Sequence, residues 1–495
     1  MKFISTRGIE NKKVSGAYAI KTGMATDGGL YMPEAVPVFE EGELDSLMSK
    51  SYCERAAHII GKFLEDYTYS ELLEDAKAAY TEKKFGSSPA PTVRISDELY
   101  MLELWHGPTC AFKDMALQLM PRLFVRALRK TEEKRTALIL VATSGDTGKA
   151  ALEGYKDIDG TKILVFYPTD GVSRVQKLQM QTQEGKNLSV LGINGNFDDA
   201  QSAVKSIFAR EDTVNALNVK NCFFSSANSI NWGRLVPQIV YYVSAYLDMV
   251  SSGDINMGEE IDVCVPTGNF GNIFAGYIAK LMGLPINKLI CASNSNNVLT
   301  DFLESGTYDK NRSFYQTISP SMDILISSNL ERLLYLIAGQ NKTREYMASL
   351  ASEGRYTVEP EILAKIKESF VGYFSDEDET QRTIKSVYEK ENCLIDTHTS
   401  VAVSSAKKYM NAYGAERKIL VVSTASPYKF AKDVYKSLTC TDPFEDDTQA
   451  LEALSLLSGV ECPIPLSSVT SKPILHTKTI GTEDMNNAVL DFVDN

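Results

Sequence analysis

Short apolar runs rich in β-branched residues alternate with helical segments along most of this chain. Each run is followed by a turn containing Gly, Ser, Asn or Asp and then by an amphipathic segment. This alternation is typical of parallel strands covered by helices, because parallel neighbours need long crossover connections. The pattern predicts strands over 136–143, 162–168, 188–193, 260–267, 288–293 and 418–424, and helices over 197–210, 273–282 and 428–438. The predicted fold class is therefore α/β.

The first part of the chain has a different pattern. Residues 1 to about 85 contain helix-like segments, such as 52–64 and 70–83, but few strand-like runs. A stretch rich in Gly, Ser and Pro over 85–91 is typical of a linker or crossover. Because 495 residues exceed what one hydrophobic core usually supports, we expect two or three domains.

Charge and cysteine usage exclude several classes of protein. The net charge is −13, with 64 acidic and 51 basic residues, which argues against nucleic acid or an anionic membrane as the main partner. The eight cysteines form no Cys-x-x-Cys pair and the four histidines are far apart, so no metal site is predicted. The N-terminus lacks a signal-type apolar stretch, and the apolar segment 235–250 is too short to span a bilayer. We expect a soluble, cytoplasmic protein.

Lys113 and two glycine-rich turns are the candidate functional features. Phe112 and Ala111 can exclude water from the lysine, and desolvation lowers the pKa of an amine so that it can attack a carbonyl. The turns over 143–148 and 266–272 join a predicted strand to a predicted helix, where backbone N–H groups bind anions. The second turn lacks the spacing of a dinucleotide or nucleoside triphosphate loop, which favours a single phosphate, as on pyridoxal phosphate. A solvated lysine and ordinary connections are the alternative interpretations.

Five motifs, in this order, resemble threonine synthase of the longer microbial type. They lie at 106–114, 143–148, 226–234, 266–272 and 424–427, and the segment 27–34 agrees with them. The resemblance covers nearly the whole chain. It implies a tryptophan-synthase-like enzyme of fold type II, in which two three-layer α/β domains with mostly parallel sheets hold the cofactor in the cleft between them. We expect a mainly helical N-terminal region over 1–94 and a catalytic unit over 95–495. Its smaller subdomain would cover about 115–230, and the larger one the remainder.

The resemblance also implies a role for each motif. Lys113 would be the catalytic residue and would carry pyridoxal phosphate covalently, and Thr424 would offer its hydroxyl to the pyridine nitrogen. The residues that would hold the cofactor phosphate are Gly268, Asn269, Phe270, Gly271 and Asn272. The residues that would bind substrate are Ser144, Gly145 and Thr147 at its amino-acid portion, and Ser229, Asn231 and Arg234 at its phosphate. Arginine suits phosphate because its planar fork matches the oxygens. Asp146 is expected to cap a helix or to face away.

The implied activity is conversion of O-phospho-L-homoserine and water to L-threonine and phosphate, by a monomer or homodimer. One alternative is another enzyme of the same class, such as a threonine/serine dehydratase, which needs no site for a substrate phosphate. A second is a non-catalytic relative that binds a phospho-ligand. Ser426 stands where the family often has histidine, which puts an acid–base role at this position in doubt. We expect His106 to support its turn and His398 to brace a helix, and their part in the reaction stays open.

Overall fold

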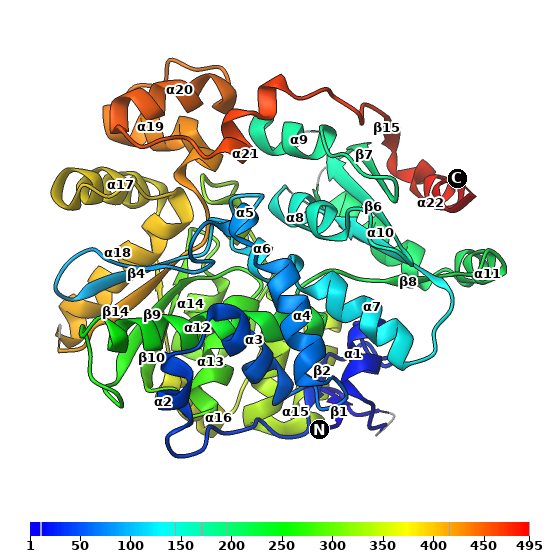
Figure 1. Cartoon of the computed structure of the whole chain (residues 1–495), viewed down its shortest axis with the longest axis horizontal. Coiled ribbons are helices and arrows are strands. Elements are labelled where there is room, and N and C mark those ends of the chain that lie inside the picture. Colours follow the sequence, from blue (N-terminus) through cyan, green and yellow to red (C-terminus); the bar gives the residue numbers. More distant parts are fainter. Residues whose placement is uncertain (10–11, 144, 170–171, 196, 415, 495) are drawn as a thin grey trace.

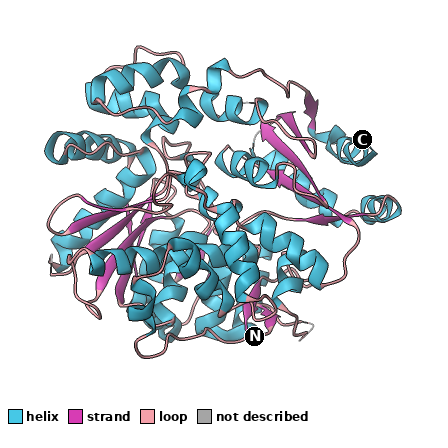
Figure 2. Ribbon diagram, viewed as in Figure 1, coloured by secondary structure: helices cyan, strands magenta, loops and turns pink. Residues whose placement is uncertain are grey.

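Two separate groups of strands organise the molecule. The structure is a computed structural model that describes residues 1–495 except 10–11, 144, 170–171, 196, 415 and 495. Figure 2 shows one strand group beside the N-terminal helices and a second group on the opposite side of the molecule. The strands and helices are interspersed along the chain as the apolar runs predict, and the α/β fold class is confirmed.

The larger group is a six-stranded sheet in the order β13-β10-β9-β14-β4-β3. Its strands are β3 (Thr92–Arg94), β4 (Leu99–Glu103), β9 (Ile261–Pro266), β10 (Ile286–Ser293), β13 (Phe370–Phe374) and β14 (Ile419–Ser423). All neighbours are parallel except β3 and β4. Val263 and Val265 of β9 pack into one hydrophobic cluster with α12 (Trp232–Ser251) and α13 (Gly271–Leu281), whereas Cys264 packs into another with α18 (Thr397–Tyr413). Both faces are therefore covered by helices.

The smaller group is a five-stranded parallel sheet in the order β15-β7-β6-β5-β8. Its strands are β5 (Thr136–Ala142), β6 (Thr161–Pro168), β7 (Leu188–Asn194), β8 (Cys222–Ser225) and β15 (Thr479–Gly481). α8 (Asp146–Tyr155), α10 (Phe197–Ala209) and the C-terminal α22 (Met485–Asp494) pack against it. β15 and α22 thus bring the end of the chain back to this sheet, at the red end of the ribbon in Figure 1. Both elements lie outside the range of about 115–230 that we expect for the smaller subdomain.

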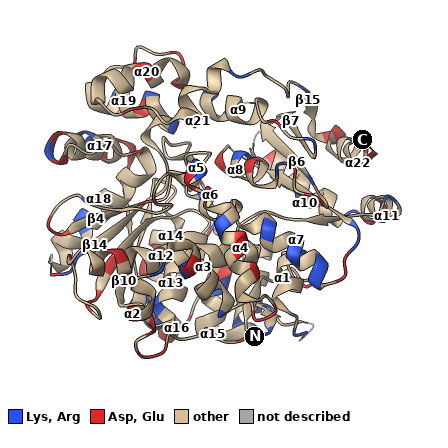
Figure 3. Cartoon of the chain, viewed as in Figure 1, with Lys and Arg blue, Asp and Glu red and all other residues tan. Residues whose placement is uncertain are grey.

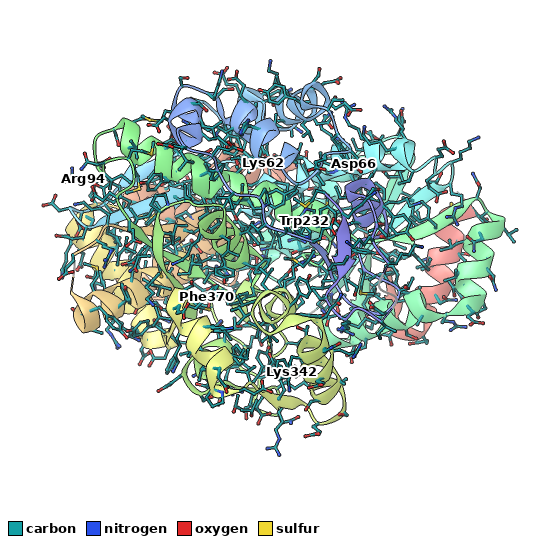
Figure 4. The ribbon with its side chains drawn as sticks, turned by 90° about the horizontal axis from the view of Figure 1, so that it is seen from below. Lys62, Asp66, Arg94, Trp232, Lys342 and Phe370 are labelled. Atoms are coloured by element: carbon teal, nitrogen blue, oxygen red, sulfur yellow. The ribbon has the colours of Figure 1, made fainter. Side chains whose placement is uncertain are left out.

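The N-terminal region is mainly helical, with α1 (Gly16–Thr22), α3 (Tyr52–Gly61), α4 (Tyr69–Ala79) and a small antiparallel pair, β1 (Phe3–Ser5) and β2 (Tyr31–Pro33). It packs against α12 and α7 (Met120–Lys130). The buried Trp232 ring lies 5.5 Å from Phe3 and 5.6 Å from Phe63, and Figure 4 shows it beside the N-terminal ribbon. β3, at the end of the expected N-terminal range of 1–94, pairs with the six-stranded sheet.

All six predicted strands are confirmed, with ends within two residues of the predicted ones. β4, β8, β13 and β15 were not predicted. The segment after Lys113 forms two helices, α6 (Lys113–Leu117) and α7, which begins at Met120. Pro121 lies in the first turn of α7, where its missing N–H costs no hydrogen bond. Within the described residues, no helix is both long and apolar enough to cross a bilayer. Figure 3 shows acidic and basic residues interspersed over both halves of the molecule.

Candidate active site

The loop before Lys113 is pinned to the end of β14. The amide of Phe112 donates to the carbonyl of Thr424 at 2.8 Å, and Ala111 forms an isolated β-bridge with Ala425. Asp114 braces the same loop, because its carboxylate accepts from the amide and the hydroxyl of Thr109 at 2.8 and 2.7 Å. Burial raises the pKa of Asp114 to about 6 despite these bonds. The contacts of Asp114 with Thr109 therefore hold the loop before Lys113 in place.

Lys113 is buried as the first residue of α6, between the two sheets. Its Nζ lies 3.3 Å from Oδ2 of Asp146, 3.4 Å from Oγ of Ser321 and 4.9 Å from the centre of the Phe112 ring. Burial lowers the pKa of Lys113, and Asp146 partly opposes this shift. A lowered pKa makes the neutral, nucleophilic amine more accessible near neutral pH.

Asp146 is a central residue of this cluster, contrary to the expectation that it would cap a helix or face away. Its buried carboxylate lies 2.8 Å from Nζ of Lys429 and accepts from Nε2 of Gln176 at 2.7 Å, in addition to its contact with Lys113. Burial alone would raise the pKa of Asp146, but Lys429 and Lys113 hold it well below its usual range. The carboxylate therefore stays ionised, and the turn over 143–148 carries a negative charge beside Lys113.

Lys429 was missed by the sequence analysis. It has no exposed surface, and besides Asp146 its Nζ donates to the carbonyl of Thr109 at 3.0 Å and to Oε1 of Gln179 at 3.2 Å. A buried lysine with three oxygen partners ties the Lys113 loop to the elements around α8. A sequence feature that could have drawn attention to Lys429 is its position two residues after the motif 424–427.

The turn over 268–272 joins β9 to α13 and leaves hydrogen-bond donors free. Phe270 has a left-handed backbone, with φ at 60°, and α13 begins at Gly271 with no side chain capping its first N–H groups. The Asn272 Oδ1 accepts from the hydroxyls of Tyr241 and Tyr242, the latter at 2.6 Å. Its buried Nδ2 has no hydrogen-bond partner among the described residues. A buried donor without a partner costs free energy, so this turn is suited to an anion.

Ser321 connects this turn to Lys113. Its Oγ contacts Nζ of Lys113, and a Cβ added at Gly268 would lie 2.7 Å from its carbonyl oxygen. Only glycine fits at 268 without moving that backbone. The amide of Ser321 donates at 3.1 Å to Nε2 of the buried His398, whose Nδ1 lies 3.0 Å from Asp396. His398 therefore holds Ser321 in place, as well as lying in the first turn of α18.

The side chain of Thr143 bonds to backbone amides of the turn before α8. The Thr143 Oγ1 accepts from the amides of Gly145 at 3.0 Å and Gly148 at 2.9 Å. Gly145 has φ at 139°, and a Cβ there would lie 2.6 Å from the side chain of Gln176. Thr147 is half-buried in the first turn of α8. Ser144, the other residue predicted to bind substrate here, lies outside the described residues.

Arg234 is a buried cation in the first turn of α12. It donates to the carbonyl of Ala227 at 2.9 Å and forms no ion pair within the described part of the chain. Burial lowers its pKa to about 10, and Tyr155 partly opposes this shift. Because a buried charge is costly without a counter-charge, the guanidinium is suited to an anionic ligand. Ser229 lies close to the turn over 268–272, since its Cβ is 3.6 Å from the position that a Cβ at Gly271 would take.

Asn231 has a structural role that the sequence analysis missed. Its Oδ1 accepts from the amide of Gly233 at 2.9 Å and caps α12, while its Nδ2 donates to the carbonyls of Ile20 at 2.9 Å and Ser226 at 3.1 Å. The residue is fully buried. Its amide therefore positions the helix that carries Arg234.

The fully buried Arg332 joins the Ser229 loop to the turn over 268–272. It donates to the carbonyls of Ser229 at 3.2 Å and Ile230 at 2.6 Å and contacts Asn329, which itself donates to the carbonyl of Asn269. Burial lowers the pKa of Arg332 to about 9. No sequence motif marked this residue, which lies in α15 (Leu330–Ser352), just over 100 positions after the loop that it holds.

His106 and Ser426 have partners away from the Lys113 amine. The Nε2 of His106 lies 2.7 Å from Glu103, and its ring stacks on Trp105 with 4.3 Å between centres. The buried Ser426 hydroxyl accepts from the amide of Tyr428 at 3.4 Å. Ser426 thus begins the short helical turn that carries Lys429.

Comparisons with known proteins agree with this fold. The family model "Pyridoxal-phosphate dependent enzyme" matches residues 87–425, and the model "Threonine synthase N terminus" matches 2–80. The chain therefore belongs to the class of pyridoxal-phosphate-dependent enzymes. Threonine synthase of Pseudomonas aeruginosa is 37% identical over 88% of this chain and 90% of its own length. The chain belongs to the threonine synthase family.

Solved structures and a second group of relatives support the same placement. The structure of PLP-bound threonine synthase from Brucella melitensis has a TM-score of 0.87 at 36% identity, and the yeast threonine synthase has 0.88 at 32%; each comparison covers all of this chain. Human threonine synthase-like 1 is 41% identical over 91% of this chain. The chain spans only 63% of the length of that relative.

Proposed function

We propose that this protein is a threonine synthase, which uses pyridoxal phosphate to convert O-phospho-L-homoserine and water into L-threonine and phosphate. The observation that carries the proposal is the presence near one buried amine of a turn with an unpartnered donor and of a buried arginine without an ion pair among the described residues. The turn over 268–272 suits the cofactor phosphate, and the unpaired Arg234 suits a second phosphate on the substrate. A dehydratase that acts on threonine or serine needs only the first of these sites.

The cofactor fits the residues present. Lys113 would hold it covalently, and Gly268, Asn269, Phe270, Gly271 and Asn272 would hold its phosphate. The uncapped start of α13 and the unpartnered Nδ2 of Asn272 support this assignment. Thr424 would face the pyridine nitrogen from the end of β14. When bound, pyridoxal phosphate withdraws electrons and stabilises negative charge on the carbons next to the substrate amine.

The substrate would lie between the start of α8 and the start of α12. We assign its carboxylate to Ser144, Gly145 and Thr147, because their turn begins α8 beside Lys113, Asp146 and Lys429. We assign its phosphate to Ser229 and Arg234. The remaining residue of the predicted phosphate set is Asn231, whose amide already makes three bonds. We therefore propose that Asn231 acts by positioning α12.

Lys113 would also move the protons of the reaction. Its lowered pKa lets the free amine remove a proton from the α-carbon and return it later. Asp146, 3.3 Å away and ionised, can stabilise the protonated amine between these steps. Phosphate would leave from the γ-carbon toward Arg234, and water would then add at the β-carbon. One amine can serve several transfers because it stays within reach of each carbon.

A paired product assay tests the proposed activity. Holoenzyme given O-phospho-L-homoserine should release phosphate and L-threonine in equal amounts. The same preparation given L-threonine should release ammonia far more slowly. Fast release of ammonia from threonine, without turnover of phosphohomoserine, would favour the dehydratase. Normal cofactor loading without turnover of either substrate would favour a non-catalytic relative.

Replacement of Arg234 tests the second anion site. Arg234→Ala should lower kcat/KM for phosphohomoserine about 10- to 150-fold, because a charge-assisted hydrogen bond contributes roughly 1.5–3 kcal/mol. Cofactor absorbance should remain, since Arg234 is not assigned to the cofactor. Arg135, which forms a surface pair with Glu133 at 2.7 Å, offers a matched control as Arg135→Ala. Equal kinetics in the two variants would remove Arg234 from the phosphate site.

We further propose how the chain is organised and where it acts. The N-terminal helical region would form one wall of the molecule, and the two sheets would form two subdomains that meet at Lys113. The acidic protein would act in the cytoplasm on a small substrate, without a nucleic-acid or membrane partner, as a monomer or homodimer. Light scattering of purified protein tests its mass in solution.

A further inference from the structure

A cavity of about 240 Å³ is lined by residues other than Lys113, and one of them, Gln179, accepts a hydrogen bond from Lys429. Its walls come from α8, from the end of α9 (Arg174–Gln181) and from the C-terminal residues 464–472. A bound water occupies about 30 Å³, so the cavity has room for a small organic molecule. None of the residues assigned to cofactor or substrate lines it.

Gln179 lines this cavity and has a hydrogen-bond donor that is unused among the described residues. The residue is 2% exposed, and its Oε1 accepts from Nζ of Lys429 at 3.2 Å. Its Nε2 has no hydrogen-bond partner among the described residues. Buried amide groups rarely stay unpaired, because the lost hydrogen bond with water is not replaced. The Nε2 therefore needs an acceptor, which a ligand in the cavity can supply.

The charges of the lining favour an anion. Lys149 is paired with Glu153 at 3.2 Å, so these two charges largely compensate each other. Lys472 is exposed and forms no ion pair within the described residues. Burial lowers the pKa of Lys149, Glu153 opposes this shift, and the charge of Lys472 acts more weakly in the same direction as burial. An anion would relieve this repulsion and would balance the excess positive charge of the lining.

The remaining wall is apolar. Ile464 and Val469 line the cavity from the C-terminal segment, and Pro108 lines it from the loop before Lys113. Such a wall contacts hydrocarbon better than it contacts water. We propose that the cavity is a second ligand site, which binds a small organic anion through Lys472 and the Gln179 amide, with a short aliphatic body against Ile464 and Val469.

Binding can be measured by calorimetry on the holoenzyme. The probes are pentanoate, which has both a carboxylate and an aliphatic chain, and inorganic phosphate, which has only the anion. Arg234→Ala serves as the starting protein, so that anion binding at the proposed substrate site does not contribute. Pentanoate should bind with a measurable Kd and more tightly than phosphate. Tighter binding of phosphate would overturn the apolar part of the proposal.

Two substitutions test the assigned contacts. Lys472→Gln should weaken binding about 10-fold or more, which is the effect of losing one charge-assisted contact. Because Lys472 is exposed, the variant should fold normally. Gln179→Glu should also weaken binding, since it replaces the free donor with a negative oxygen. The control is Lys478→Gln, an exposed lysine of the same segment that does not line the cavity.

Three results would contradict the proposal. The first is equal affinity in Lys472→Gln and Lys478→Gln. The second is unchanged affinity in Gln179→Glu. The third is the lack of heat of binding for both probes up to about 50 mM, a concentration at which even a Kd of several millimolar is detected. None of these results bears on phosphohomoserine turnover, so this proposal and the proposed activity fail independently.

Discussion

Lys113→Ala is expected to lose the visible absorbance of bound cofactor and to slow turnover at least about 10⁴-fold. The variant removes the amine that would hold the cofactor covalently and the group that would move the protons. General acid–base catalysis alone contributes roughly 10²–10⁴-fold, and loss of the covalent link adds to that loss. Absorbance spectra of purified protein after incubation with pyridoxal phosphate, followed by phosphate-release kinetics, measure both effects.

Lys84→Ala is the matched control for this variant. Lys84 is a half-buried lysine whose pKa is lowered by burial, and its Nζ donates to Oε1 of Gln118 at 2.6 Å. A lysine with a lowered pKa can react with aldehydes wherever it lies, so this control separates a specific site from general reactivity. The cofactor band should persist in Lys84→Ala. A band that persists in Lys113→Ala and disappears in Lys84→Ala would transfer the role to Lys84.

Lys429→Met is expected to lower the free energy of unfolding by about 3–5 kcal/mol. The substitution leaves the carboxylate of Asp146 buried without its nearest cation, and breaking a buried ion pair is costly for this reason. Asp146→Asn should have a cost of the same order. The double variant should recover part of the loss, because neither charge is then left alone. Urea unfolding of the four proteins gives the coupling free energy.

The effect of pH distinguishes this electrostatic loss from a packing defect. In the native protein the pKa of Asp146 is held well below its usual range, so its contribution to stability is present above the unfolded pKa of about 4. That contribution disappears as the pH falls through the lowered folded pKa. Without Lys429 the carboxyl takes up a proton at higher pH. The loss of unfolding free energy in Lys429→Met should therefore be largest at neutral pH and should become smaller as the pH falls.

Lys436→Met provides the control on the neighbouring helical turn. Lys436 is partly exposed and lies 3.9 Å from Asp442, an arrangement that usually contributes less than about 1 kcal/mol. A deficit of similar size in Lys436→Met and Lys429→Met would contradict the buried-pair explanation. So would a Lys429→Met deficit that stays constant with pH, since lost packing does not titrate.

The strands that the sequence predicted and those that it missed differ in burial and length. β9 and β14 are buried on both faces, so each appears as a nearly continuous apolar run, broken in β9 by Asp262. β8 has only four residues and β15 only three, which is too short for a pattern to stand out. β13 follows a helix directly, without the Gly, Ser, Asn or Asp turn that marks the others. Their pairing depends on partners more than 50 residues away.

The candidate site shows the same division. Lys113 and the turns over 143–148 and 266–272 could be recognised because glycine spacing and strand-to-helix order are local properties of the chain. Ser321, Arg332 and Lys429 could not, since each acts through contacts with segments distant in sequence. Asp146 was recognised as a residue of the turn but was assigned the wrong surroundings, because its two lysine partners lie 33 and 283 positions away.

By itself, the sequence determined the α/β class and singled out Lys113 and two glycine-rich turns. These properties depend on hydrophobic periodicity and on the conformational freedom of glycine, which neighbouring residues encode. Only the tertiary structure decided which charges face the amine, which buried arginines of the described residues form no ion pair and where the C-terminal strand pairs. Such properties arise from distances between segments that the chain brings together only when both sheets have formed, and they set the pKa values on which the proposed chemistry depends.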